Sequence, residues 1–390
     1  MAFDFDAPFS RVGTDSVKWD INEEIFGRSD VIPLWVADMD FPAPKEVSEA
    51  LCARAAHGAF GYTIYPEEFY DVFINWAKNR YNWDIHREWM VNSHGVVEAI
   101  NTAIQCFTTI NDPVLIQTPV YQPFFKSIRN NERQLVTSPL IETPAGYEMD
   151  FADLETKFAS GVKMMILCSP HNPVGRVWRR DELVRLAQLL VRYNVLLISD
   201  EIHADIIYPG YRQIPIATLD ETLARQCITL YAPGKTFNIA GLTTAVTIIP
   251  DEELRTQYCD FSNKMGEHIG NTLGITAFIA AYKYGSPWLD ALNQYVWSNY
   301  QFVKHFVAEY IPQLRVTAQQ GTFLLWLDCR NLPMKATECS RFFIDKAGLG
   351  LNDGTWFGKD GAGFMRMNIA CRRSLIQQAL EQLQNAVEHL

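Results

Sequence analysis

A series of short apolar runs, separated by stretches with helical periodicity, constrains the fold of this chain most strongly. Each run holds five or six residues, which suits a buried strand and is far too short to cross a membrane. Short apolar runs of this kind are typical of parallel strands that are covered on both faces of a sheet. The runs occupy residues 113–118, 164–169, 195–199, 227–232 and 245–249.

The stretches between these runs repeat their apolar residues with the period of an α-helix. Alternating strands and helices predict an α/β fold whose large domain, residues 45–285, contains a mostly parallel sheet. Two sets of residues would each lie on one helical face: Val97, Ile100, Ile104 and Phe107, and Leu183, Leu186, Ala187, Leu190 and Val191.

The two ends of the chain have a different pattern and predict a smaller α+β domain. This domain would comprise residues 286–390 together with residues 1–44. Its predicted elements are a helix over 288–310, strands at 323–327 and 364–368, and a last helix from residue 374.

The composition excludes several classes of protein. Lys and Arg number 34 against 45 Asp and Glu, so the net charge of −11 argues against a nucleic-acid partner. Eight cysteines without a Cys-x-x-Cys pair favour free thiols in the reducing cytoplasm, and residues 1–10 lack the features of a signal peptide. We therefore expect a cytoplasmic protein with no membrane partner and, since no metal-binding motif occurs, no metal site.

Polar residues mark four segments, three of which follow predicted strands, at the sheet edge where open α/β proteins bind ligands, while the fourth precedes a predicted helix. Gly95 directly precedes a helix, whose N-terminus favours a phosphate, and Asn172 lies in a turn rich in proline. Asp200 ends a buried strand, where a carboxylate needs a partner. Lys235 lies in an apolar loop, and burial favours the neutral amine that forms Schiff bases. Each feature also fits a structural alternative: a turn, a helix cap or a surface lysine.

The order and spacing of these residues are more specific than any one of them. Asn172 precedes Asp200 by 28 residues, and Asp200 precedes Lys235 by 35. The chain thereby resembles the pyridoxal-phosphate (PLP) enzymes of the aspartate-aminotransferase fold. More narrowly it resembles the MalY/PatB branch of cystathionine β-lyases, or C–S lyases. The segments that carry this resemblance are residues 35–41, 199–203, 235–242 and 365–371.

The resemblance implies a role for each candidate residue around the cofactor ring. Lys235 would form the Schiff base, and Asp200 would keep the pyridine nitrogen protonated. Asn172 and His203 would lie near the ring hydroxyl, and Tyr121 would stack on the ring.

The resemblance also assigns residues to the cofactor's phosphate. Gly95, Val96 and Val97 would donate backbone N–H groups to it. Tyr62 would reach the phosphate of the neighbouring subunit's cofactor, which implies a homodimer.

Arg366 would bind the α-carboxylate of the substrate through a bidentate pair, with Arg372 and Arg373 as rival candidates. The sequence departs from many aminotransferases at two phosphate-binding positions, where it has Ala232 in place of Ser and Thr243 in place of Arg. Backbone groups or a neighbouring subunit would have to compensate.

The resemblance to the lyase branch implies β-elimination on an L-cysteine S-conjugate, such as the conversion of L-cystathionine to homocysteine, pyruvate and ammonia. Two alternatives stay open at this point. One is an aminotransferase on the same cofactor, because every residue named above would serve both reactions. The other is a regulatory protein that acts by binding another protein.

Overall fold

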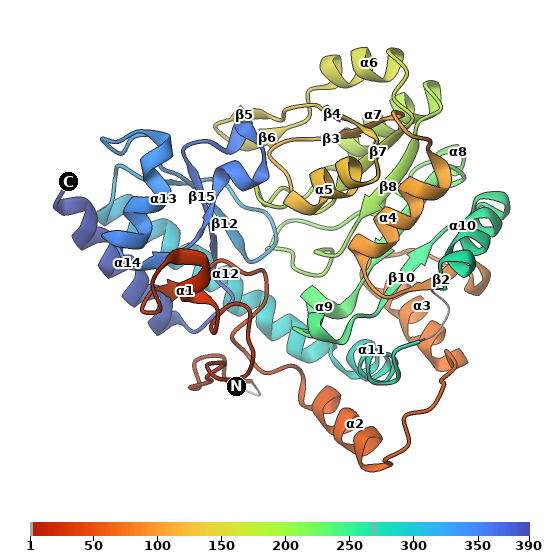
Figure 1. The fold of residues 1–390 in the computed structure, drawn as a ribbon, viewed down its shortest axis with the longest axis horizontal. Helices are drawn as coiled ribbons and strands as arrows, with labels where there is room; N and C mark the ends of the chain where they lie inside the picture. The colour runs from red at the N-terminus through yellow and green to blue at the C-terminus, as the bar shows by residue number, and fades with distance from the viewer. Residues whose placement is uncertain (1–2, 267–269) are drawn as a thin grey trace.

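The computed structural model describes residues 3–266 and 270–390 of the chain. Two β-sheets lie side by side, each with helices around it (Figure 1). The larger sheet has seven strands in the order β2-β10-β9-β8-β7-β3-β4, and β10 alone runs antiparallel to its neighbours. Its strands are β2 (Met90–Ser93), β3 (Pro113–Ile116), β4 (Gln134–Thr137), β7 (Met164–Cys168), β8 (Leu196–Asp200), β9 (Cys227–Tyr231) and β10 (Ala245–Ile248).

Helices cover both faces of this sheet, which explains why its strands are apolar throughout. Along β3, for example, Leu115 and Ile116 point to opposite faces and pack into two separate apolar clusters. One face is covered by α4 (Val96–Phe107), α5 (Gln122–Asn130) and α10 (Glu252–Met265). The other is covered by α3 (Glu67–Tyr81), α6 (Phe151–Ala159), α7 (Arg180–Arg192), α8 (Glu221–Ala224) and α11 (Thr272–Tyr284).

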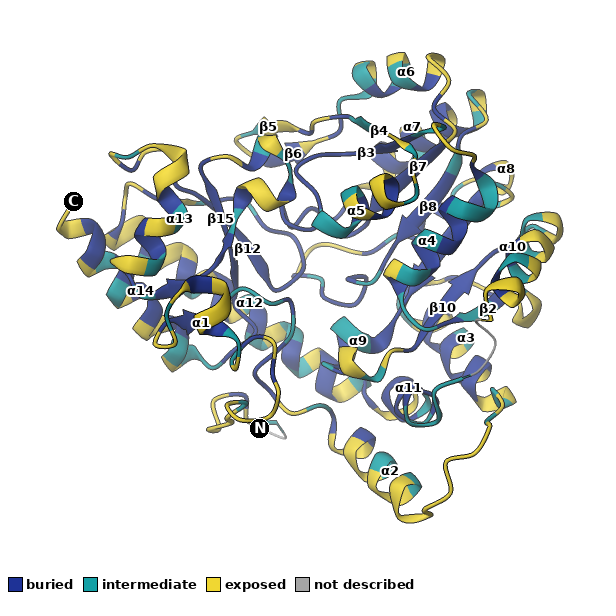
Figure 2. Ribbon diagram, viewed as in Figure 1, coloured by how far each residue is buried: buried dark blue, intermediate teal, exposed yellow. Residues whose placement is uncertain are grey.

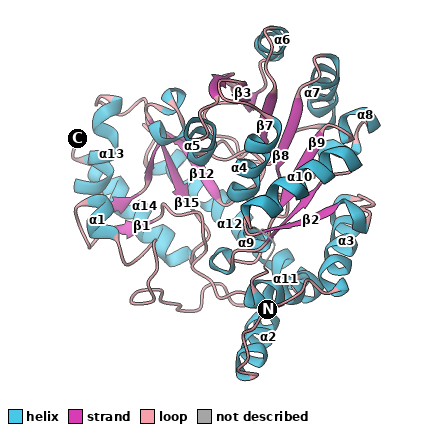
Figure 3. Ribbon diagram, turned by 45° about the vertical axis from the view of Figure 1, so that its right-hand side comes forward, coloured by secondary structure: helices cyan, strands magenta, loops and turns pink. Residues whose placement is uncertain are grey.

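The smaller sheet is antiparallel and has four strands in the order β11-β12-β15-β14. The strands are β11 (Arg315–Val316), β12 (Leu324–Asp328), β14 (Asn352–Asp353) and β15 (Phe364–Asn368). The long helix α12 (Ser286–Tyr310) packs against α14 (Arg373–Glu388), and α13 (Ala336–Asp345) lies beside them (Figure 3).

The N-terminal segment joins this second unit through a short parallel pair, β1 (Ile32–Pro33) with β13 (Leu349–Gly350). Residues 1–44 and 286–390 are therefore linked, although the exact limits of the two domains stay a prediction. The remaining elements are α1 (Asn22–Phe26), α2 (Lys45–Ala56), α9 (Pro233–Thr236) and the hairpin β5 (Ile141–Thr143) with β6 (Gly146–Glu148).

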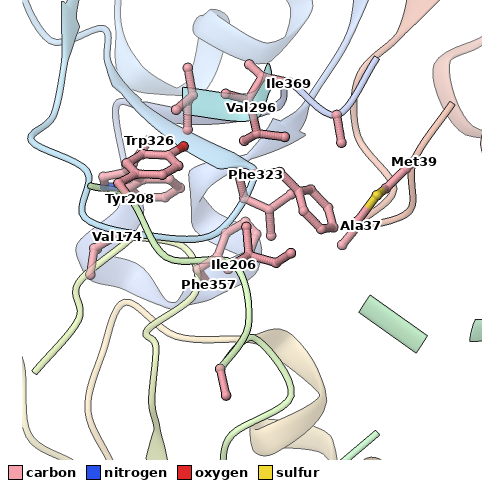
Figure 4. Close-up of a cluster of buried hydrophobic side chains, with 14 of the residues drawn as sticks. Ala37, Met39, Val174, Ile206, Tyr208, Val296, Phe323, Trp326, Phe357 and Ile369 are labelled. Atoms are coloured by element: carbon pink, nitrogen blue, oxygen red, sulfur yellow. The ribbon is translucent and has the colours of Figure 1, made fainter. Parts of the chain in front are cut away.

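The two units share an apolar core. Figure 4 shows Phe323 of the second unit beside Ile206 of the first, and both belong to one apolar cluster. The strands and the inward faces of the helices consist of buried residues, and exposed residues lie on the outer faces of the helices (Figure 2). Within residues 3–266 and 270–390, no helix is both long and apolar enough to span a membrane.

All five strands predicted from apolar runs are confirmed, and so is the predicted face of α7. The predicted face of α4 is confirmed except at Val97, which is exposed; Val96 takes its place on the buried side. The predicted elements of the C-terminal region are confirmed as α12, β12, β15 and α14. The pattern of apolar runs does not predict β2 or β4. Both are edge strands that include polar residues, such as Asn92 in β2 and Gln134 in β4, so they lack a continuous apolar run.

Candidate active site

A cavity of about 290 Å³ opens at the carboxyl ends of the central strands of the larger sheet. The turns that follow β2, β7, β8 and β9 all contribute to it, so the structure brings together the four segments that the sequence singled out. Eight of the ten residues predicted for the site line the cavity: Gly95, Val96, Val97, Tyr121, Asn172, Asp200, His203 and Lys235.

Lys235 reaches the cavity from α9, the single turn that follows β9. Its amine donates a hydrogen bond to the carbonyl oxygen of Ala37 at 2.7 Å and forms no ion pair with any described residue. Burial lowers the pKa of Lys235 to about 8, against the opposing charges of Asp38 and Asp200. A substantial fraction of this amine is therefore neutral, and so nucleophilic, near physiological pH.

Asp200 is the last residue of β8 and is buried. Its carboxylate accepts a hydrogen bond from the backbone N–H of Ile202 at 3.1 Å, and no described cation lies within ion-pairing distance of it. Burial raises the pKa of Asp200 to about 7, and neither this hydrogen bond nor the charge of Lys235 offsets the effect. The carboxylate is thus suited to a partner that enters the cavity with a positive charge.

The neighbouring acidic residue, Glu201, does not require a positively charged partner from the cavity. The Glu201 carboxylate accepts hydrogen bonds from Ser199, Gln213 and Tyr231, with the Gln213 amide nitrogen at 2.9 Å. This carboxylate is therefore satisfied by the protein itself and does not line the cavity.

His203 and Asn172 stand on the wall of the cavity beside Asp200. The Nδ1 atom of His203 is buried without a hydrogen-bond partner, and burial lowers the pKa of this ring to about 3. The ring is neutral, and its unpaired nitrogen is free to bond a polar atom in the cavity. Tyr121 precedes α5 and presents its side chain to the same space.

Arg366 lies on β15 of the smaller sheet, where it is 4% exposed. Its guanidinium donates to three neutral acceptors: Asn172 Oδ1 at 3.0 Å, Asn352 Oδ1 at 2.6 Å and the Trp35 carbonyl oxygen at 2.8 Å. Its Nε has no partner, and burial lowers the pKa of the group to about 10. No described carboxylate compensates this buried charge, so a carboxylate ligand would be strongly favoured here.

None of the three candidate arginines is itself among the residues that line the cavity. Arg373 donates from Nε to Asn299 and stacks over Phe302, 4.6 Å from its ring centroid. Arg372 lies at the start of α14. Of the three, Arg366 alone contacts a residue of the cavity wall, because it is bonded to Asn172.

The N-terminus of α4 faces the cavity and offers backbone donors. The N–H groups of His94 and Gly95 are already directed at the Glu98 carboxylate, at 2.9 and 3.4 Å. Gly95 therefore shares its donor with Glu98, and Val96 and Val97 are the better placed amides for an anion.

Two hydroxyl residues at the cavity were not assigned to the site from the sequence. Thr243 and Thr244 line the wall next to Ala232, and Thr243 has a left-handed backbone with φ of 39°. Such a conformation is unfavourable for a threonine and is retained mainly where function requires it. Their hydroxyls lie on the same wall as Ala232, and the spacing of the motifs gives no indication of them.

Tyr62 is not part of the cavity of its own chain. Its side chain is 96% exposed in the extended segment between α2 and α3.

The comparison with known families agrees with this geometry. The sequence model described as aminotransferase class I and II matches residues 29–383. The chain belongs to this family. The fold and family predicted from the order of the motifs are thereby confirmed.

Individual proteins of this family are similar to the chain over almost its full length. Cystathionine β-lyase PatB of Bacillus subtilis is 39% identical over 98% of this chain and 99% of its own length. Among solved structures, cystalysin from Treponema denticola, which contains pyridoxal 5′-phosphate, superposes with a TM-score of 0.96 at 38% identity and covers 100% of both chains. The PLP-bound C–S lyase from Staphylococcus hominis has a TM-score of 0.91 at 32% identity and covers 99% of this chain and 98% of its own.

The residues of this family member fit PLP on structural grounds. PLP carries an aldehyde, which reacts with a neutral amine, and a pyridine nitrogen, which a buried carboxylate keeps protonated. It also carries a phosphate, which the N-terminus of a helix favours. Lys235, Asp200 and the start of α4 supply these three groups around one cavity. The unpaired Nδ1 of His203 provides an independent polar contact on the same wall.

Proposed function

We propose that this protein is a PLP-dependent C–S lyase that converts L-cystathionine, or a related cysteine S-conjugate, to a thiol, pyruvate and ammonia. The observation that carries the proposal is the convergence of three charged groups, none of which forms an ion pair with a described residue: Lys235 and Asp200 line one cavity, and Arg366 is bonded to Asn172 of its wall. Similarity over the full length of a cystathionine β-lyase supports the choice of reaction.

PLP, when bound, supplies an electron sink that stabilises negative charge on the substrate's α-carbon. Lys235 would hold it covalently, Asp200 would keep a proton on its ring nitrogen, and Tyr121 would cover the ring. His203 and Asn172 would contact the ring hydroxyl. The phosphate would be held by Val96, Val97, Thr243 and Thr244, with a shared contact from Gly95.

Arg366 orients the substrate. Its buried guanidinium attracts the α-carboxylate more strongly than an exposed arginine would, because little water competes for it. The contacts to Asn172, Asn352 and Trp35 fix the plane of the guanidinium before the substrate arrives. The substrate's amino group and α-hydrogen are thereby directed toward Lys235.

Lys235 moves the proton. With a pKa of about 8, its Nζ atom can take the α-hydrogen of the substrate and can pass that proton on. A cysteine S-conjugate then loses a thiolate from Cβ, a good leaving group since thiols have a pKa near 8.5. The same Nζ could return the proton elsewhere in a transamination, so the residues alone do not separate the two reactions.

We infer that the active unit is a homodimer. Phe60, Tyr62 and Ile64 alternate along the exposed segment between α2 and α3, and their side chains are 59%, 96% and 78% exposed. Three large apolar side chains in an extended segment suit contact with a second copy of the chain. Tyr62 would reach the phosphate in the partner's cavity.

Mixing two inactive variants tests this assembly. If Tyr62 serves the partner's site, a hybrid of Lys235→Ala and Tyr62→Ala chains contains one intact site and one doubly defective site. Random mixing would restore about one quarter of the wild-type activity. If mixing restores no activity beyond that of the two parents, Tyr62 acts within its own chain or not at all.

A cytoplasmic location completes the proposal. All eight cysteines are free thiols, as expected in a reducing compartment.

The reaction itself is tested by product analysis. Purified protein loaded with PLP should release pyruvate, ammonia and homocysteine from L-cystathionine in equal amounts without an added keto acid. Strict dependence on a keto acid, with no thiol released, would establish an aminotransferase instead.

A further inference from the structure

The segment of residues 35–41, here called the strap, crosses between the two sheets and contacts both sides of the active site. Its backbone carbonyls accept hydrogen bonds from side chains of both units. On one side the donors are Lys235 and Asn238, and on the other they are Arg366 and Asn368. The strap is therefore the one described segment bonded directly to both the amine and the guanidinium of the site.

Asn238 holds the strap on the side of Lys235. It lies three residues after Lys235 and has a left-handed backbone with φ of 57°. Its amide donates to the carbonyls of Met39 and Phe41 at 2.9 and 2.8 Å and accepts from the N–H of Met39 at 2.9 Å. These bonds fix the strap next to Ala37, whose carbonyl receives the Lys235 amine.

Asn368 holds the strap on the side of Arg366. It lies two residues after Arg366 on β15 and is 1% exposed. Its amide donates to the carbonyls of Val36 and Asp38, both at 2.6 Å, and its oxygen accepts from the N–H of Ala370 at 2.7 Å. These bonds fix the strap next to Trp35, whose carbonyl receives Arg366, and they also flank Ala37.

The strap is anchored on its outer side as well. Lys18 is fully buried and donates to Asp40 at 2.7 Å, while Arg11 pairs with Asp38 at 2.7 Å. On its inner side Ala37 and Met39 pack at the edge of the apolar cluster, with Ala37 beside Phe323 (Figure 4). A segment held on every side transmits a displacement at one end to the other.

We propose that Asn238 and Asn368 are positioning residues that set the separation of Lys235 from Arg366 through the strap. Asn238 acts on the amine through the carbonyl of Ala37, and Asn368 acts on the guanidinium through the carbonyl of Trp35. The inference rests on the proposed function for its kinetic consequences, but not for the loading of the cofactor. Misplacement of a reacting group by about 1 Å can cost up to 10²-fold in rate.

The two asparagines should therefore affect different kinetic constants. In Asn368→Ala we expect KM for L-cystathionine to rise about tenfold with kcat within about threefold of wild type, because the carboxylate site is disturbed. In Asn238→Ala we expect kcat to fall about tenfold with KM within about threefold, because the amine is disturbed. The isosteric variants Asn238→Asp and Asn368→Asp lose the same donors and should shift the same constants.

Asn299 provides a matched control. It is fully buried, and its amide likewise donates to two backbone carbonyls, those of Ile369 and Cys371, both at 3.0 Å. It does not touch the strap. Asn299→Ala should lower the unfolding temperature as much as Asn368→Ala does, while changing neither KM nor kcat by more than about twofold.

A second measurement does not depend on turnover. The rate at which cofactor-free protein takes up PLP, followed by absorbance, requires the Lys235 amine in place. We expect this rate to fall several-fold in Asn238→Ala, to fall less in Asn368→Ala, and to stay unchanged in Asn299→Ala. Equal effects of all three variants, or no effect of either strap variant on its own constant, would overturn the proposal. If wild type released no pyruvate, the lyase function would fail, but the loading rates would still decide the role of Asn238.

Discussion

Asp200 and Glu201 are consecutive residues at the end of β8, and their side chains meet opposite surroundings. Both are buried, and burial raises the pKa of each to about 7. On the packed side, Glu201 is met by three side-chain donors. On the cavity side, Asp200 has a single backbone N–H.

This difference separates polar groups that complete the fold from polar groups that await a ligand. A buried carboxylate without sufficient partners costs stability, so its retention indicates a partner that binds later. Lys235 and Arg366 share this property with Asp200, since neither forms an ion pair with a described residue. The cavity side should therefore respond to substitution mainly in activity, and the packed side mainly in stability.

The largest expected effect is that of Lys235→Ala. We expect pyruvate release to fall by at least about 10³-fold, because both the covalent attachment and the proton-transferring amine are lost. The unfolding free energy of the cofactor-free variant should not decrease, since an enclosed amine without a counter-ion is removed. Activity close to wild type would exclude Lys235 as the catalytic base.

Arg366→Ala should have the next largest effect. Loss of the carboxylate contact is expected to raise KM by about 10²-fold, as measured by initial rates of pyruvate release. Arg373→Ala serves as the control and should change KM by less than about twofold, because Arg373 is bonded to Asn299 away from the cavity. If the two variants behaved alike, Arg366 would not be the carboxylate site.

Glu201→Ala should show the opposite behaviour. Removing this acceptor leaves the donors of Ser199, Gln213 and Tyr231 unpaired, so we expect the unfolding free energy to fall by about 2–4 kcal/mol. Urea denaturation of the cofactor-free protein at pH 4, where burial keeps the carboxyl groups of Glu201 and Asp200 protonated in the folded state, measures the change. A loss below about 0.5 kcal/mol would show that the packed side is not stabilised by these bonds.

Much of the fold could be predicted from the sequence, because strands buried on both faces must be apolar throughout. The predicted strands 164–169 and 195–199 correspond to β7 and β8, and their ends differ by at most one residue. The edge strands β2 and β4 could not be found this way, since an edge strand carries polar residues.

The site was predictable where its chemistry depends on side chains of distinctive type and order, as for Asn172, Asp200 and Lys235. It was not predictable where backbone atoms act. The backbone carbonyls of Trp35 and Ala37 accept hydrogen bonds from Arg366 and Lys235, but the residue types at these two positions do not indicate this. That Gly95 shares its amide with Glu98 likewise depends on the geometry of one helix turn.

The pH dependence of unfolding of the cofactor-free protein tests whether the Asp200 carboxylate lacks a sufficient partner within the protein. The pKa of Asp200 is about 7 when folded, and an unfolded Asp has a pKa of about 3.9. Ionisation therefore destabilises the folded wild type progressively as the pH rises from about 4 to 7, a cost that Asp200→Ala avoids.

The decisive measurement is the unfolding free energy of cofactor-free Asp200→Ala relative to wild type in urea at pH 8. We predict a variant at least as stable as wild type, by up to about 2 kcal/mol, with this advantage disappearing toward pH 4. A loss of about 2 kcal/mol or more at pH 8 would show instead that the protein itself satisfies the Asp200 carboxylate, which would then need no bound partner.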